Sequence, residues 1–203
     1  SGLPPFDIEK IPPVSVERHP PDDPFEGFQE MLDDSFHPWI DEIEEFGPRP
    51  SVELDRPYDP EETVLHALGL RRAGRLDEAR QLLRSLIDQD PSDIDAYGHL
   101  ALIAFEDEDD VPKAHALYAR GVAIGNRAIG SGRDVMAFWG CNGNRPFLRC
   151  LHGVGICQWR QKMWPEARRT LNRLLWLSPH DNQGVRFILP KLRQRNVWRR
   201  DAD

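Results

Sequence analysis

The stretch that decides the fold runs over residues 59–91 and reads DPEETVLHALGLRRAGRLDEARQLLRSLIDQDP. Asp59 and Pro60 predict a helix start, because Asp caps the first free amides and Pro already has the φ angle of the first helical position. Gly74 allows the chain to turn, and a second helical pattern then continues until Pro91 ends it. The stretch therefore predicts two antiparallel helices joined by a tight turn.

The same stretch resembles the tetratricopeptide repeat, which is a pair of antiparallel helices in about 34 residues. That family has small residues where the two helices cross and a proline after the second helix, and here these are Ala67, Ala79 and Pro91. The resemblance implies an all-α fold. It would be a short right-handed α-solenoid of three TPR-like helix pairs, with an N-terminal docking segment and a C-terminal capping helix.

Two further units carry the same signature. Ala101 and Ala114 mark the second unit, and Gly155 and Ala167 mark the third. Ala114 and Ala167 are 53 residues apart, so an insertion separates these two units. Within a helical domain at 59–203, we predict repeats at about 60–93, 94–128 and 148–181, an insertion at 129–147 and a capping helix at 182–199.

A narrower resemblance concerns the surroundings of the third unit. A Trp-Gly loop at Trp139-Gly140 precedes it, and the motif Asp181-Asn182-Gln183-Gly184 follows it. This combination is similar to a group of bacterial tetratricopeptide proteins. The resemblance implies the same fold and no defined activity.

Residues 1–58 form an acidic, proline-rich segment that differs from the repeats. Residues 1–60 carry 16 acidic and 4 basic side chains, whereas the rest of the chain carries 18 acidic and 22 basic ones. The first 21 residues are expected to be extended, and disordered unless they dock. Apolar residues spaced by three and four predict short amphipathic helices within 24–46, either as a cap on the first repeat or as a partner-binding arm. The opposite charges indicate that this segment can fold back onto the body.

Composition excludes several classes of protein. The chain has no apolar run long enough to span a membrane and no start that reads as a signal peptide. Its three cysteines, without paired spacing, suggest reduced thiols. We therefore expect a cytoplasmic protein that is not inserted in a membrane, and no motif predicts a cofactor.

The predicted ligand site is a concave groove lined by the first helix of each pair. Family geometry places nine residues of this chain in that groove: Leu68, Arg71, Arg72, Leu102, Phe105, Arg149, His152, Ile156 and Trp159. Such a lining suits a protein or peptide ligand with apolar anchors and acidic flanks. The acidic N-terminal segment has this composition, so it could act as an intramolecular ligand. The predicted function is a non-enzymatic protein-interaction scaffold.

Two alternatives use other parts of the chain. A basic C-terminal helix could bind RNA, although a net charge of −8 and a pI near 5.4 disfavour nucleic acid as a partner. An enzyme would need a bound ligand or a thiol of lowered pKa in the insertion around 130–150. Metal binding is not predicted, because the spacing of Cys141, Cys150, His152 and Cys157 matches no zinc motif.

Overall fold

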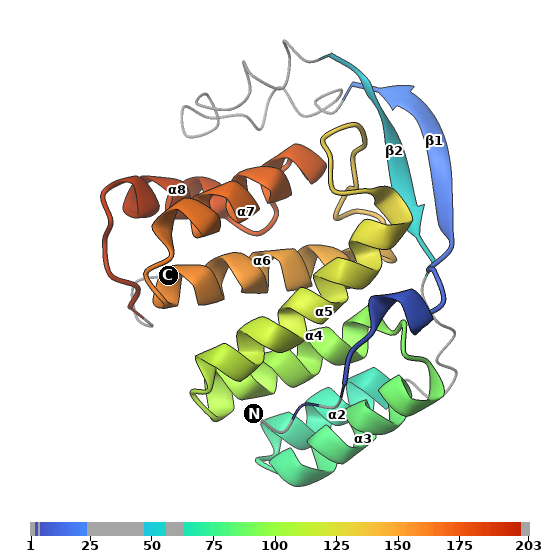
Figure 1. The fold of residues 1–203 in the computed structure, drawn as a ribbon, viewed down its shortest axis with the longest axis vertical. Coiled ribbons are helices and arrows are strands. Elements are labelled where there is room, and N and C mark those ends of the chain that lie inside the picture. The colour runs from blue at the N-terminus through green and yellow to red at the C-terminus, as the bar shows by residue number, and fades with distance from the viewer. Residues whose placement is uncertain (1–2, 4, 24–46, 56–62, 200–203) are drawn as a thin grey trace.

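A computed structural model describes residues 3, 5–23, 47–55 and 63–199 of the chain. Seven α-helices dominate this described part (Figure 1). The elements in chain order are η1 Ile8–Lys10, β1 Val16–Asp22, β2 Arg49–Leu54, α2 Thr63–Arg72, α3 Leu76–Gln89, α4 Ile94–Leu102, the π-helical turn η3 Ile103–Asp107, α5 Val111–Ile129, α6 Asn144–Arg160, α7 Trp164–Leu177 and α8 Val185–Arg193.

The helices form three consecutive antiparallel pairs, α2 with α3, α4 with α5 and α6 with α7, followed by α8 on α7. The pairs succeed one another from the bottom to the top of Figure 1. Side chains at the helix starts explain two of the boundaries. Asp93 accepts a hydrogen bond from the amide of Ala96 at 3.0 Å, and Asp110 accepts one from the amide of Lys113 at 3.0 Å.

Small side chains lie where the helices of each pair approach one another. Ala67 and Ala79 are fully buried in the first pair, as are Ala114 in the second and Ala167 in the third. A Cβ atom on Gly155 would lie only 2.6 Å from a methyl carbon of Leu171. The residues that suggested a repeat are therefore the ones that permit close helix packing.

The expectation of an all-α fold was incomplete, because β1 and β2 form a two-stranded antiparallel sheet. Val16 pairs with Leu54 at one end and Asp22 with Arg49 at the other, and the register shifts between Arg18 and Pro21. Two prolines, Pro20 and Pro21, lie within β1. They are tolerated because β1 is an edge strand with a bulge, where a missing amide donor costs little.

On the side of β2 that faces away from β1, the insertion takes the position that a third strand would have. The amide of Val52 donates to the carbonyl of Met136 at 2.8 Å, and the amide of Met136 donates to the carbonyl of Pro50 at 2.9 Å. The side chain of Asn144, fully buried, donates to the Val52 carbonyl at 2.7 Å and accepts from the Leu54 amide at 3.0 Å. The insertion thus fixes the sheet to the start of α6.

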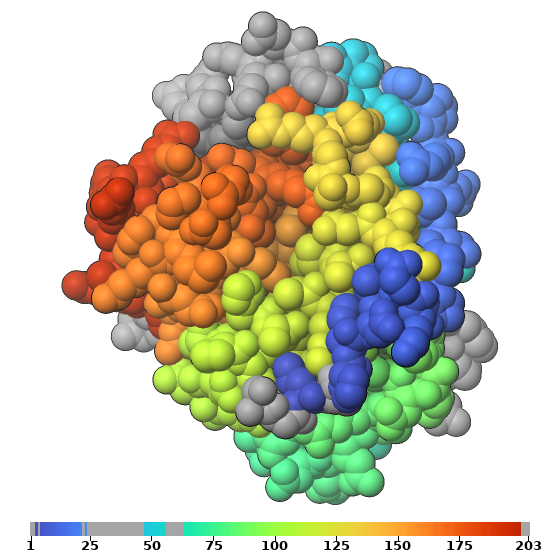
Figure 2. Space-filling view, in the orientation of Figure 1, coloured from blue at the N-terminus to red at the C-terminus, as the bar shows by residue number. Residues whose placement is uncertain are grey.

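The N-terminal segment before β1 is extended and docks on the helices, as Figure 2 shows in blue over the green and yellow helices. Phe6 meets Tyr97 edge to face at 6.1 Å between ring centroids, and Ile11 is buried. The guanidinium of Arg127 donates to the carbonyl of Ile11 at 2.7 Å. The helices that we predicted within 24–46 lie outside the described residues.

Two element boundaries differ from the sequence prediction. The irregular stretch between the second and third pairs covers only 130–143, because α5 continues to Ile129 and α6 begins at Asn144. The last helix is shorter than predicted and ends at Arg193, after which Arg195 adopts a left-handed conformation with φ of 55°. No helix in the described part of the chain has the length and apolar character needed to cross a membrane.

Candidate functional site

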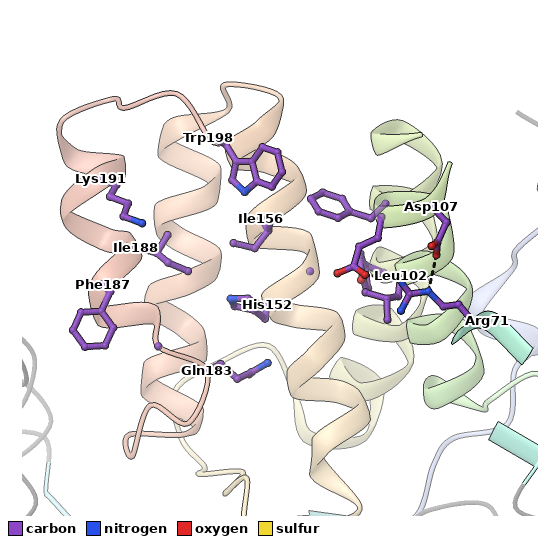
Figure 3. Close-up of a pocket in the computed structure, with 15 residues that line it drawn as sticks. Arg71, Leu102, Asp107, His152, Ile156, Gln183, Phe187, Ile188, Lys191 and Trp198 are labelled. Atoms are coloured by element: carbon purple, nitrogen blue, oxygen red, sulfur yellow. Dashed lines mark hydrogen bonds and ion pairs between the residues drawn. The ribbon is translucent and has the colours of Figure 1, made fainter. Parts of the chain in front are cut away.

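An apolar pocket of about 810 Å³ lies between the ends of α2 and α4 on one side and α8 on the other (Figure 3). Helix α6 forms the wall between them, with His152 and Ile156 facing the pocket. The residues that line the pocket are Arg71, Leu102, Phe105, Glu106, Asp107, Tyr118, His152, Gly153, Ile156, Gln183, Gly184, Phe187, Ile188, Lys191 and Trp198. A pocket of this size and lining can accept large apolar side chains.

The π-helical turn η3, at the end of α4, places Phe105 in the lining of the pocket. The second unit is one residue longer than the repeat pattern, since Ala79 and Ala114 are 35 residues apart. A π-helical turn accommodates one extra residue within a helix, and such turns are frequent at functional sites. The extra residue is thus absorbed at the end of α4, where Phe105 lines the pocket.

The floor of the pocket depends on a glycine. A Cβ atom on Gly153 would lie 2.6 Å from two ring carbons of Tyr118, so only glycine lets this ring reach the pocket from α5. The Tyr118 phenol is neutral at physiological pH even at its ordinary pKa, and burial raises that pKa further. The floor therefore presents a neutral aromatic ring to a ligand.

Several charged groups near the pocket are arranged in ion pairs. The guanidinium of Arg71 lies 2.6 Å from a carboxylate oxygen of Asp107 and also contacts Glu106 (Figure 3). Arg160 pairs with Asp109 at 2.6 Å. These pairs leave little excess charge at this rim, so the apolar surface between them dominates the chemistry of the pocket.

Five of the nine residues predicted for the groove line this pocket: Arg71, Leu102, Phe105, His152 and Ile156. They come from the last turns of α2 and α4, from η3 and from the middle of α6. The structure therefore brings together predicted groove residues from all three units.

The other four predicted residues lie elsewhere. Leu68 is half-buried on α2 and Arg72 is exposed. Arg149 lies 2.6 Å from the carboxylate of Asp95, which is itself buried. Trp159 is buried, and its Nε1 donates to the carbonyl of Asn196 at 2.7 Å. Arg149 and Trp159 thus make contacts within the chain that the sequence did not indicate.

Sequence reasoning missed the wall that α8 and the residues after it provide. Its apolar pattern had been assigned to covering the third pair, and Val185, Ile188 and Leu192 are indeed buried. Phe187 falls outside that pattern and is 55% exposed at the edge of the pocket. An exposed aromatic residue out of phase with the buried face was the available signal for a second wall.

The insertion does not show the thiol that an enzyme would need. Burial raises the pKa of the Cys141 thiol, and the neighbouring Glu53 carboxylate raises it further, whereas a nucleophilic cysteine needs a lowered pKa. Cys150 and Cys157 are buried free thiols. Among the described residues, no group of three or more His, Cys, Asp or Glu side chains is placed to hold a metal ion.

The basic C-terminal helix is partly engaged within the protein. Arg186 lies 3.1 Å from the buried carboxylate of Asp181 and stacks on Phe187. Lys191 lies over the ring of Trp159 at 5.9 Å. Arg193 and Arg195 are exposed. Two of the basic side chains that suggested RNA binding thus contribute to packing around α8.

Comparison with known proteins agrees with this architecture. The tetratricopeptide repeat family matches residues 60–103. This range covers the first helix pair, all of α4 and the first residue of η3. The match supports the tetratricopeptide superfamily. Repeats of this kind typically act as non-enzymatic scaffolds that mediate protein–protein interaction. No curated protein matches the chain. The narrower likeness to bacterial proteins with a Trp-Gly loop stays a prediction.

Proposed function

We propose that the protein is an interaction scaffold that binds a peptide or a segment of a partner protein in the pocket between α4 and α8. The apolar pocket carries the proposal, because a cleft of about 810 Å³ with aromatic and aliphatic walls is suited to apolar anchors of a polypeptide. An amphipathic helix that places its apolar face in a groove is one common mode of such binding.

We also propose a narrower chemistry for the ligand. Apolar anchors agree with the lining by Leu102, Phe105 and Ile156. Acidic flanks have less support, because Arg71 is already paired with Asp107 and Glu106. We therefore propose that apolar anchors provide most of the binding free energy and that acidic flanks add little.

We propose residues 24–46 as the intramolecular ligand. None of the described residues of 3–22 lines the pocket, since this part docks on α4 and α5. Asp22 pairs with Arg49 across the sheet, so the chain leaves the sheet and returns to it at one place. A short Gly-Asn turn can therefore replace 24–46 without stretching β1 or β2.

The experiment is an affinity capture from lysate of the source cells, with the full chain and the short-turn variant as baits and with nuclease treatment. Ile156→Gln places an amide in the pocket wall, and Leu65→Gln is its matched control, because Leu65 is a 56% exposed leucine that does not line the pocket. We expect a protein whose capture survives nuclease, is lost with Ile156→Gln and is kept with Leu65→Gln.

The other outcomes are equally informative. Stronger capture by the short-turn variant supports self-capping by residues 24–46. Loss of all captured material on nuclease treatment favours the hypothesis that the basic C-terminal residues bind RNA. Capture that is insensitive to Ile156→Gln would place the binding surface outside the pocket and refute the proposal.

A further inference from the structure

The chain after α8 crosses the end of the pocket and places an aromatic side chain in it. The amide of Asn196 donates to the carbonyl of Lys191 at 2.9 Å, which turns the chain back after the helix. The carbonyl of Asn196 then accepts the Nε1 hydrogen of Trp159 at 2.7 Å. Val197 is 62% exposed, whereas Trp198, the next residue, is half-buried and lines the pocket (Figure 3).

The position that Trp198 occupies is chemically selective for an aromatic ring. The ring meets Phe105 edge to face, with 5.7 Å between centroids and an interplanar angle of 80°. The guanidinium of Arg160 lies 4.6 Å from the centroid of Trp198 and 5.1 Å from that of Phe105. Both contacts depend on the π-system, so an aliphatic side chain of similar volume would make neither.

The cation of this arrangement is held in place. Arg160 is paired with Asp109 at 2.6 Å, and its side chain is only 18% exposed. An arginine fixed in this way does not have to be ordered when a ring arrives beneath it, which lowers the entropy cost of binding. The same side chain covers Phe105, so the ring and the cation form one surface.

We infer that Phe105 and Arg160, together with Ile156 from the pocket wall, form an aromatic-anchor subsite that Trp198 fills in this structure. The partner is a polypeptide with an exposed aromatic residue, and it binds by placing that ring where Trp198 lies. This inference rests on the proposed function for its biological meaning. The selectivity of the subsite is a property of the isolated protein and can be measured without the partner.

The test measures whether a small aromatic molecule binds where the Trp198 side chain has been removed. Trp198→Ala empties the subsite, and N-acetyl-tryptophanamide serves as the probe, with N-acetyl-leucinamide for comparison. Binding is followed by the NMR shift of the Ile156 methyl groups. Val197→Ala is the matched control, because it shortens the exposed neighbour of Trp198.

We expect the tryptophan derivative to bind the Trp198→Ala protein in the millimolar range, roughly tenfold tighter than the wild type, in which it must compete with Trp198. The Val197→Ala protein should behave as the wild type, and the leucine derivative should bind the emptied site several times more weakly. Replacing Arg160 by Met in the Trp198→Ala background should reduce the preference for tryptophan over leucine, because only the contact with Phe105 then remains.

Equal binding of both derivatives to the emptied site, or equal binding of the tryptophan derivative to wild type and Trp198→Ala, would overturn the inference. If Trp198→Ala does not fold, Trp198→Leu keeps apolar bulk without the π contacts, and its affinity for the tryptophan derivative should exceed that of the wild type. If the tryptophan derivative binds the Trp198→Ala protein selectively but no partner is captured from lysate, the subsite is supported and the proposed function is not. If a partner is captured in a way that depends on Ile156 but the tryptophan derivative does not bind selectively, the proposed function is supported and the aromatic subsite is refuted.

Discussion

The close approach of α5 and α6 can be tested by adding a single methyl group. A Cβ atom on Gly125 would lie within 3 Å of three ring carbons of Phe147, at 2.6 Å from Cε2. The ring is fully buried and has Arg173 over it at 5.7 Å, so it has little room to move. Gly69 in α2 is the matched control, since a Cβ atom there would meet no other atom within 4 Å.

The two substitutions should change stability in opposite directions. Alanine in place of a helical glycine gains about 1 kcal/mol from helix propensity, and Gly69→Ala should show that gain. Overpacking a core typically costs about 1–3 kcal/mol, so after the gain of about 1 kcal/mol from helix propensity Gly125→Ala should lose up to about 2 kcal/mol net. For a chain of this size, each kcal/mol corresponds to about 2–4 °C in Tm.

Urea titration followed by circular dichroism measures both variants on one scale. Phe147→Leu removes ring atoms from the contact, so the cost of Gly125→Ala should be much smaller in that background. If Gly125→Ala stabilises the protein as much as Gly69→Ala does, the two helices do not approach as closely as described. The arrangement of the second and third pairs, and with it the pocket wall formed by α6, would then have to be revised.

Three further predictions concern single side chains. Asn144→Ala should lower the free energy of unfolding by about 2–4 kcal/mol in urea titration, because it leaves the buried amide of Leu54 and a buried carbonyl without partners. Glu53→Gln should speed the reaction of Cys141 with a chromogenic disulfide at pH 8, because the carboxylate raises the pKa of that thiol; an unchanged rate would contradict this. Burial lowers the pKa of His115 below its ordinary 6.5, so the unfolded chain takes up this proton first. Stability should therefore fall as pH drops below about 6.5, and His115→Gln should flatten that fall in urea titrations between pH 7 and 5.

The helix pairs could be predicted because their signals are local. A capping side chain, a glycine turn and small residues at helical spacing all act within one repeat, and Asp93, Asp110 and Ala114 do so in the structure. The sheet could not be predicted in this way. Its partner on the other side of β2 is Asn144, about 90 residues further along the chain, and no local pattern signals such a contact.

The candidate site could be predicted in part for the same reason. Leu102, His152 and Ile156 follow from repeat geometry, which places them on the first helix of a pair. Trp198 does not, because its position depends on the turn after α8 and on the hydrogen bond between Trp159 and Asn196. The sequence shows a tryptophan among arginines, and only the folded chain shows that the ring points into the pocket.

The N-terminal segment contributes to the fold, and this determines how self-capping must be tested. Removing residues 1–47 would delete β1 and the buried Ile11, and would leave β2 with an unpaired edge. Exposed strand edges pair with other chains, so this truncation should aggregate or unfold, as size-exclusion chromatography would show. The variant with a short turn in place of 24–46 keeps both strands and should remain a folded species. If instead the truncated protein is as stable as the full chain, the sheet and the docked segment contribute nothing to folding. In that case, stronger capture of a partner by either variant would mean that the groove had become more accessible, and not that the fold had changed.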